Sequence, residues 1–197
     1  MRVVQGIVVL FVLVSNYSFA EPRSVDAGEF DIAGVKLGMS LKDAVAAITA
    51  KLDIKKGEIE FEKFLRPNPV TKTKEPYYFI VKKSGASITV HMQPKVSRDI
   101  EDPMLVSLVI YEQPWTQENV RAMKNMALEK YGEPSNGVVG SSYQWCGKPH
   151  SNPGFGCFEF KGAKLEYSGT KLQLTNFLYQ QAVIDFMNKR ITSKPMF

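Results

Sequence analysis

The sequence contains few of the side chains that hold transition metals, with two cysteines and two histidines among its 197 residues. A zinc site at Cys146, His150 and Cys157 would need both thiols free and a fourth ligand, and the chain offers no second Cys/His cluster. Gly-x-Ser-x-Gly, His-Glu-x-x-His and glycine-rich phosphate-binding motifs are also absent from the sequence. We therefore expect no metal, no cofactor and no enzymatic activity.

The sequence also has no apolar run long enough to cross a bilayer. The run over 7–14 is far shorter than the roughly 18–20 residues required, which argues against a signal anchor. Arg2 precedes this run and Ser18-Phe19-Ala20 follows it, a pattern typical of a cleavable signal peptide. We expect residues 1–20 to be removed after Ala20. No cysteine stands directly after the cut, since the first one is Cys146. We therefore expect a mature protein without a lipid anchor or other membrane anchor that is periplasmic or secreted.

Basic residues are in modest excess, and the formal net charge of +5 is spread along the chain. No run alternates basic residues with aromatic ones, so we expect no nucleic-acid partner. A mild positive field would favour anionic partners, whereas the simpler and preferred interpretation is a basic surface that aids solubility.

The stretch 34–52 predicts the first helix, around which the rest of the chain is organised. Ser40 is suited to cap its first turn, and Gly38 permits the tight turn that leads into it. Apolar residues recur at helical spacing along it, at Leu41, Ala44, Val45, Ile48 and Leu52.

Downstream, alternating apolar residues and turn residues predict mainly strands. The expected strands lie near 59–65, 77–83, 86–92, 104–111, 142–146, 157–161, 164–168 and 171–177. A second helix should begin at the cap Thr116 and end near Tyr131, where Gly132 and Pro134 follow. A last helix is expected over 178–190.

This pattern predicts an α+β domain over residues 31–191, after a flexible N-terminal segment at 21–30. We expect an antiparallel sheet of about eight strands, packed on one face by two or three helices. One helix followed by four strands occurs twice, so 31–111 and 112–191 could be tandem units. The two halves share little identity, and the duplication is therefore a hypothesis. The uncovered face of the sheet would be available for binding.

The residues Gly34-Val35-Lys36-Leu37-Gly38-Met39-Ser40, with Asp43 and Val45 after them, resemble the opening of small helix-plus-β-meander domains of bacterial envelopes. Those domains include the small lipoprotein of the outer-membrane barrel-assembly machinery and the tandem-repeat β-lactamase inhibitor protein. The stretch Tyr131-Gly132-Glu133-Pro134 is similar to the Gly-x-Pro that ends helices in these families. The resemblance covers about twenty residues in two places, and the chain lacks the lipidated cysteine of the lipoprotein. It implies a binding role for the sheet and assigns no contact residue.

Cys146 and Cys157 are expected to form a structural disulfide, because an exported protein meets an oxidising compartment and a redox pair would more often read Cys-x-x-Cys. The ring that they close is rich in glycine and proline, and it presents Lys148, His150 and Phe155 beside Trp145. A rigid loop with aromatic and basic side chains suits recognition, so these four residues are the candidate binding site. Alternatively, Trp145 and Phe155 could fold inward as a small satellite core.

These observations predict an exported, non-catalytic binding protein: an inhibitor, an adaptor or an envelope-assembly factor. Its partner would be another envelope or secreted protein, and the sequence does not define its oligomeric state. The alternative is a protein that binds a small ligand or wall polymer in the concavity of the sheet, with the aromatic residues Phe61, Phe64, Tyr77, Tyr78 and Phe79. A hydrolase is a third possibility, because Glu58, Glu60 and Glu62 alternate along one strand, although such carboxylates usually form a solvated face.

Overall fold

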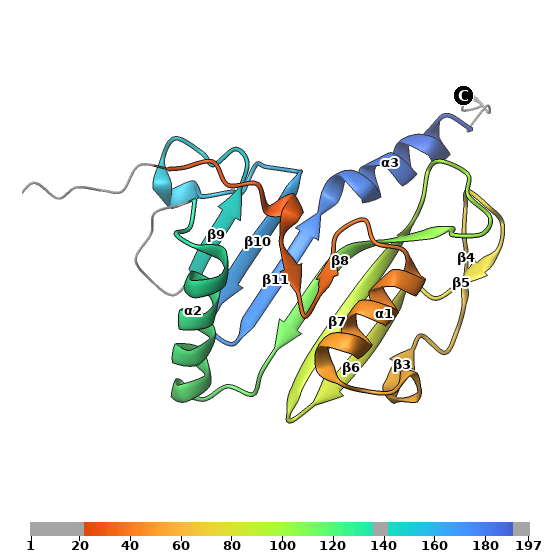
Figure 1. Ribbon diagram of the computed structural model, residues 1–197. Helices are drawn as coiled ribbons and strands as arrows, with labels where there is room; N and C mark the ends of the chain where they lie inside the picture. Colours follow the sequence, from red (N-terminus) through yellow and green to blue (C-terminus); the bar gives the residue numbers. More distant parts are fainter. Residues whose placement is uncertain (1–21, 136–141, 191–197) are drawn as a thin grey trace, which may run out of the picture.

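A seven-stranded antiparallel sheet organises the part of the chain that the computed structural model describes, residues 22–135 and 142–190 (Figure 1). Its strand order is β3-β6-β7-β8-β11-β10-β9. The strands are β3 (Ile59–Phe61), β6 (Tyr78–Lys83), β7 (Ala86–Pro94), β8 (Met104–Glu112), β9 (Ser142–Cys146), β10 (Ala163–Ser168) and β11 (Lys171–Asn176). Each run of strands is a meander, and the last strands of the two runs, β8 and β11, pair at the middle of the sheet.

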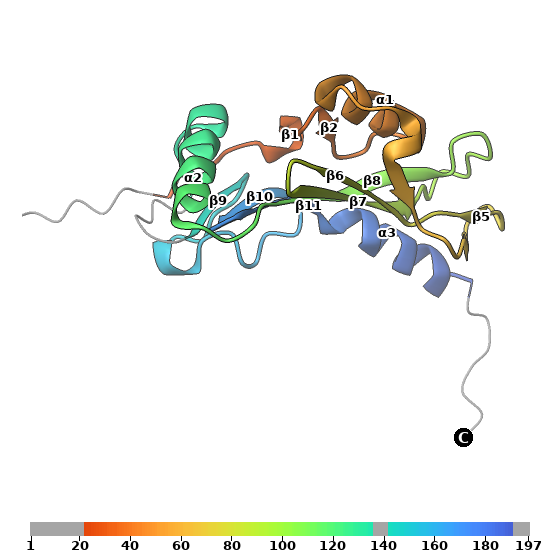
Figure 2. The ribbon, with the colours of Figure 1, turned by 90° about the horizontal axis from the view of Figure 1, so that it is seen from below.

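Helices cover both faces of this sheet. Figure 2 shows α1 (Leu41–Leu52) and α2 (Gln117–Tyr131) on one face, here called the helix-pair face, and α3 (Phe177–Asn188) on the opposite face. The predicted fold class, an antiparallel sheet packed by helices, is therefore confirmed. The structure differs from the prediction in its seven strands and in the position of α3. The side chain of Asn176 caps α3 immediately after β11, so the chain enters the helix without a loop that could carry it to the other face.

The missing eighth strand is the one predicted over 157–161. Residues in this stretch form a turn that follows a 3-10 helix at Pro153–Phe155. Two other short ladders lie outside the main sheet: β1 (Asp31–Ile32) with β2 (Val35–Lys36), and β4 (Arg66–Pro67) with β5 (Lys74–Glu75). Further 3-10 turns are Ala27–Glu29 and Lys56–Glu58.

The core lies between the sheet and the helix pair. A single row of directly paired, fully buried side chains crosses six strands, from β9 to β6: Trp145, Leu165, Leu174, Val109, Val90 and Phe79. This row is continuous across the β8–β11 pairing, so both halves of the chain share one core. Within the described residues, no helix is long and apolar enough to cross a membrane.

The N-terminal segment, which we expected to be flexible, contacts the sheet edge from residue 23 onward. Arg23 N–H donates to the carbonyl of Ser135 at 3.0 Å, and Val25 N–H donates to the carbonyl of Cys146 at 2.8 Å. Ala27 is fully buried against the core. These contacts bring the segment to the end of β9, next to the first cysteine.

The caps of α1 and α2 provide a test of the two predicted helix starts. Ser40 Oγ accepts the N–H of Asp43 at 3.0 Å, and Thr116 Oγ1 accepts the N–H of Asn119 at 3.0 Å. Ser40→Ala and Thr116→Ala should each lower the free energy of unfolding by about 1 kcal/mol, because one first-turn donor loses its acceptor. Ser40→Asp is the control, since it keeps an acceptor. Urea denaturation measures the effect. An unchanged midpoint for an alanine variant would show that this cap does not contribute to the stability of the fold.

Candidate functional site

The loop that joins β9 to β10 crosses the sheet face that also carries α3 (Figure 2). The predicted disulfide is present between Cys146 and Cys157, with a Cα–Cα distance of 6.1 Å, and both cysteines are fully buried. The first cysteine ends β9, so the bridge fixes the far end of the loop to the outermost strand of the sheet. The loop therefore starts and returns at the same edge.

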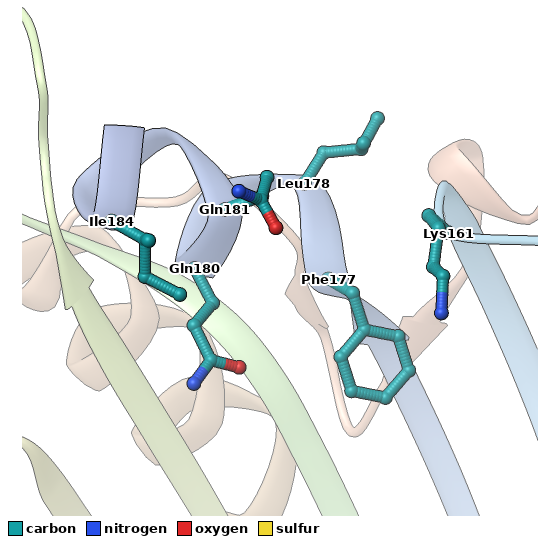
Figure 3. Close-up of a pocket in the computed structure, with 6 residues that line it drawn as sticks. All are labelled: Lys161, Phe177, Leu178, Gln180, Gln181 and Ile184. Carbon is teal, nitrogen blue, oxygen red and sulfur yellow. The ribbon is translucent and has the colours of Figure 1, made fainter. Parts of the chain in front are cut away.

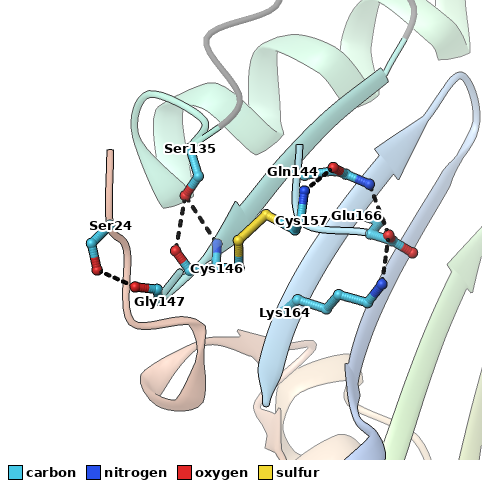
Figure 4. Close-up of a disulfide and its surroundings, with 8 residues drawn as sticks. All are labelled: Ser24, Ser135, Gln144, Cys146, Gly147, Cys157, Lys164 and Glu166. Atoms are coloured by element: carbon cyan, nitrogen blue, oxygen red, sulfur yellow. Dashed lines mark hydrogen bonds and ion pairs between the residues drawn. A yellow bond between two sulfur atoms is a disulfide. The ribbon is translucent and has the colours of Figure 1, made fainter. Parts of the chain in front are cut away.

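A chain of polar contacts ties this loop to the strands beneath it (Figure 4). Cys157 N–H donates to Gln144 Oε1 at 2.7 Å, and Gln144 Nε2 donates to Glu166 Oε1 at 2.9 Å. Lys164, which is buried, forms an ion pair with the same Glu166 oxygen at 3.1 Å. Gln144, Lys164 and Glu166 occupy neighbouring positions on one sheet face, because β9 and β10 pair Lys164 with Cys146 and Glu166 with Gln144.

The start of the loop is held from the other side by two serines (Figure 4). Ser135 Oγ donates to the carbonyl of Cys146 at 3.1 Å and accepts the N–H of Cys146 at 3.0 Å. Ser24 Oγ donates to the carbonyl of Gly147 at 2.7 Å. The loop is therefore held in place by a covalent bridge and by hydrogen bonds from both sides of the strand.

Trp145 does not face a partner, so its prediction as a binding residue is wrong. Its side chain is 0% exposed, and its Nε1–H donates to the carbonyl of Gly132 at 3.0 Å. Trp145 lies on β9 and alternates with Gln144, so it points to the helix-pair face. The inward alternative is correct for this residue, although the ring joins the main core rather than a satellite cluster.

The other three predicted residues lie together on the loop. Phe155 is 57% exposed, and its ring lies 4.9 Å from the His150 ring, centroid to centroid. His150 N–H donates to the carbonyl of Gly156 at 2.7 Å, and His150 Nδ1 accepts the N–H of Asn152 at 2.9 Å. Lys148 is exposed. Phe155 therefore does not fold inward, and its ring contacts that of the hydrogen-bonded His150.

Sequence reasoning missed Phe158, which is 76% exposed. Phe158-Glu159-Phe160 alternates like a strand, and for that reason these residues were assigned to one. A Cβ on Gly162 would lie 2.5 Å from the Phe160 ring, so a larger residue there would force that ring to move. Glu159 and Phe160 line an open depression of about 360 Å³ together with Lys148, Pro149 and His150.

We call Lys148, His150, Phe155 and Phe158 the loop surface. Where the loop rejoins β10, it borders a second apolar area at the start of α3 (Figure 3). Phe177 N–H donates to the carbonyl of Lys161 at 3.1 Å, which places the end of the loop against the helix. The cavity between them measures about 260 Å³, and exposed apolar side chains from α3 line it, namely Phe177, Leu178 and Ile184.

The aromatic residues proposed to line a concavity do not gather in one. Phe79 is fully buried in the core, and Phe61 lies on the same helix-pair face, 5.7 Å from it. Phe64 is 85% exposed, and the Tyr77 ring lies 4.4 Å beneath the guanidinium of Arg66. The sequence pattern groups these residues by their closeness along the chain, whereas Phe64 lies in a bend after β3 and Tyr77 precedes β6, so neither follows the pleat of a strand.

The three glutamates near β3 each serve a separate structural contact. Glu58 accepts the N–H of Lys55 at 2.7 Å, and Glu60 forms an ion pair with Lys82 at 3.1 Å. Glu62 pairs with Arg66 at 2.9 Å. Among the described residues, no group of three His, Cys, Asp or Glu side chains is placed to hold a metal ion.

His91 lies half-buried on β7. Its ring lies 6.0 Å from the Tyr78 ring. Burial lowers the pKa of His91, and the nearby charge of Arg66 lowers it further, while Glu62 acts in the opposite direction. The neutral imidazole is therefore favoured at this position, where the Ser107 hydroxyl donates to the His91 carbonyl at 3.3 Å.

Comparison with known proteins adds no relative, since no protein-family model matches this chain and neither curated proteins nor solved structures gave a match.

Proposed function

We propose that this chain is an exported, non-catalytic binding protein of the bacterial envelope that holds another protein through the loop surface. The observation that carries the proposal is the exposure of Phe155, on the ring that the disulfide closes, and of Phe158, directly after the second cysteine of that ring. Exposed aromatic side chains are frequent anchors at protein interfaces. A loop already fixed in one shape loses little conformational entropy when a partner binds.

The shape of this surface favours a protein partner over a small ligand. The depression beside Lys148 and His150 is open, and the two exposed phenylalanines project from the loop rather than line an enclosed pocket. Small-molecule sites usually bury most of their ligand in a concave pocket. The apolar area at the start of α3 extends the surface, and exposed apolar patches of this kind often mark interfaces.

The proposed localisation, periplasmic or secreted, depends on two features of the chain. Residues 1–20 have the pattern of a signal peptide and lie outside the described residues. The disulfide between Cys146 and Cys157 is compatible with an oxidising compartment such as the periplasm or the cell exterior. We propose cleavage after Ala20 and a partner that shares that compartment.

Phe158→Ala should weaken binding of the partner by about 10- to 100-fold, which is typical of an aromatic hot spot. The partner would first be trapped in the envelope by a photo-crosslinking amino acid placed at position 158, and its affinity then measured by calorimetry. Phe64→Ala is the matched control, because Phe64 is 85% exposed but far along the chain from the loop. Intact mass of the exported protein would also show whether it begins at Glu21.

Equal loss of affinity for Phe158→Ala and Phe64→Ala would contradict a specific role for the loop surface. Crosslinks that form from position 64 and not from position 158 would assign the interface to another part of the molecule.

A further inference from the structure

A second candidate site lies on the helix-pair face of the sheet, opposite the loop surface. A groove of about 360 Å³ opens between α1 and α2, which flank the β1–β2 hairpin in Figure 1. Its floor is made by Ile88, Tyr111 and Leu172, which are direct neighbours across β7, β8 and β11. Leu52 from α1 and Met126 from α2 form its walls.

The groove continues along the sheet rather than ending at these walls. A smaller cavity of about 120 Å³ shares Leu52, Ile88 and Tyr111 with it and extends over the β6–β7 hairpin toward Ala86. At the other end, Ile32 and Ala33 of the β1–β2 hairpin close the groove. The result is one apolar channel with half-exposed walls above a buried floor.

Three lysines line this channel, and Asp31 lies beside its rim. No aspartate or glutamate lines it, whereas Lys51 and Lys130 line the groove and Lys83 lines its extension. Lys83 Nζ donates to the carbonyl of Leu52, and Lys130 forms an ion pair with Asp31 at 2.9 Å. Lys51 is exposed, and its charge is close enough to Asp31 to help lower the pKa of that carboxyl, but the two form no direct ion pair. Because Asp31 pairs with Lys130 at 2.9 Å, the Lys51 ammonium group can also face a ligand.

Asp31 keeps Lys130 at this rim. Burial acts to raise the pKa of the Asp31 carboxyl, but hydrogen bonds from Lys130 and the Gly34 N–H outweigh it, and the pKa lies below its usual value. The carboxylate therefore stays ionised at neutral pH and pairs with Lys130.

We infer that this groove binds a single-chain anionic amphiphile, with its acyl chain on the apolar floor and its carboxylate or phosphate at Lys51. Each buried methylene would contribute about 0.8 kcal/mol, and the volume lies within the range of about 300–1,000 Å³ found for small-molecule pockets. A helix about 10 Å across would fill this volume in less than one turn, which argues against a helical partner. A neutral chain would leave the basic rim without a counterpart.

The test is calorimetric titration of the delipidated mature protein with four probes below their micellar concentrations. Oleate and lysophosphatidylglycerol carry anionic heads, whereas lysophosphatidylcholine and oleyl alcohol carry none with net negative charge. We expect saturable one-to-one binding of at least one anionic probe, and the tighter of the two identifies the source of the head group. Affinity for the anionic probe should fall as salt is raised.

Variants assign the binding to the groove. Lys51→Met should weaken the anionic probe about 5-fold, and Met126→Glu should weaken it at least 10-fold by placing a charge in the apolar wall. Lys42→Met on the outer face of α1 and Phe158→Ala on the loop surface should leave it unchanged. Met126→Gln replaces Met126→Glu if the latter does not fold, as judged by circular dichroism.

Three results would overturn the inference. The first is no saturable binding of either anionic probe. The second is an affinity for the zwitterionic or the neutral probe equal to that for the anionic probes. The third is binding that the Met126 variants leave unchanged. Because Phe158→Ala belongs to the loop surface, the failure of this inference leaves the proposed protein-binding function to its own test.

Discussion

Trp145→Ala should lower the free energy of unfolding by about 4 kcal/mol, as expected for the loss of a large, fully buried aromatic side chain. The indole ring is fully buried between β9 and α2, where the rings of Tyr131 and Tyr143 lie 6.0 and 6.3 Å from it. Alanine would leave a cavity there. It would also remove the donor to the carbonyl of Gly132, at the end of α2.

Trp115→Ala is the matched control, because the chain has only two tryptophans and Trp115 is 74% exposed. It should change stability by less than about 0.5 kcal/mol. Urea denaturation followed by far-ultraviolet circular dichroism compares the two variants without relying on tryptophan fluorescence. A Trp145→Ala protein within 1 kcal/mol of the wild type would mean that the sheet edge closes over the lost ring.

The elements that the sequence predicted well are those whose signals are local. The bounds of α1 follow from the apolar stripe and the Ser40 cap, and β9 follows from the alternation of Tyr143 and Trp145 with Gln144. The same alternation was enough to place Trp145 inside. The sequence analysis placed Trp145 in the strand 142–146 and beside the loop, but it did not use the alternation with Gln144 to choose between the outward and the inward orientation.

The parts that escaped prediction depend on contacts distant in the sequence. An amphipathic pattern gives the apolar side of α3 but not the face of the sheet that receives it, and that choice depends on its direct start after Asn176. The turn at Cys157 depends on the disulfide and on the acceptor Gln144, which lies 13 residues earlier. The groove between α1 and α2 arises because Leu52 and Met126, which are far apart in the chain, line opposite sides of it on the same face of the sheet.

The two proposed sites use opposite faces of one sheet, and their electrostatic and apolar character differs. The loop surface combines exposed aromatic rings with Lys148 and His150, whereas the groove combines an apolar floor with a lysine rim. The sheet lies between them, and the core row that includes Trp145 and Val109 is on the same face as the groove. Substitutions at either site should therefore add independently, as is usual for sites without shared partners.

Removal of the disulfide by the double substitution Cys146→Ala and Cys157→Ala should lower the free energy of unfolding by about 3 kcal/mol in the chain-entropy model of a short ring. The domain should stay folded, because its core row does not pass through the bridge. Gln144 would still accept the N–H of residue 157, so the end of the loop would keep one contact with the sheet. Urea denaturation measures the stability of the double variant and of the chemically reduced wild type. A free-thiol count shows that the wild type is fully reduced.

The loop surface should lose its fixed conformation after this change, while the domain stays folded. Without the bridge, the glycine- and proline-rich ring can adopt many conformations, and ordering it again would oppose partner binding. We expect amide exchange to become fast at His150, whose N–H now donates to Gly156, while the amide of Val106 in β8 stays protected. Partner affinity should fall about 10-fold or more, a loss of roughly 1.4 kcal/mol. A reduced protein that is folded and binds as tightly as the oxidised one would make the bridge a structural staple only, and the interface would then have to lie at the start of α3, around Phe177 and Leu178.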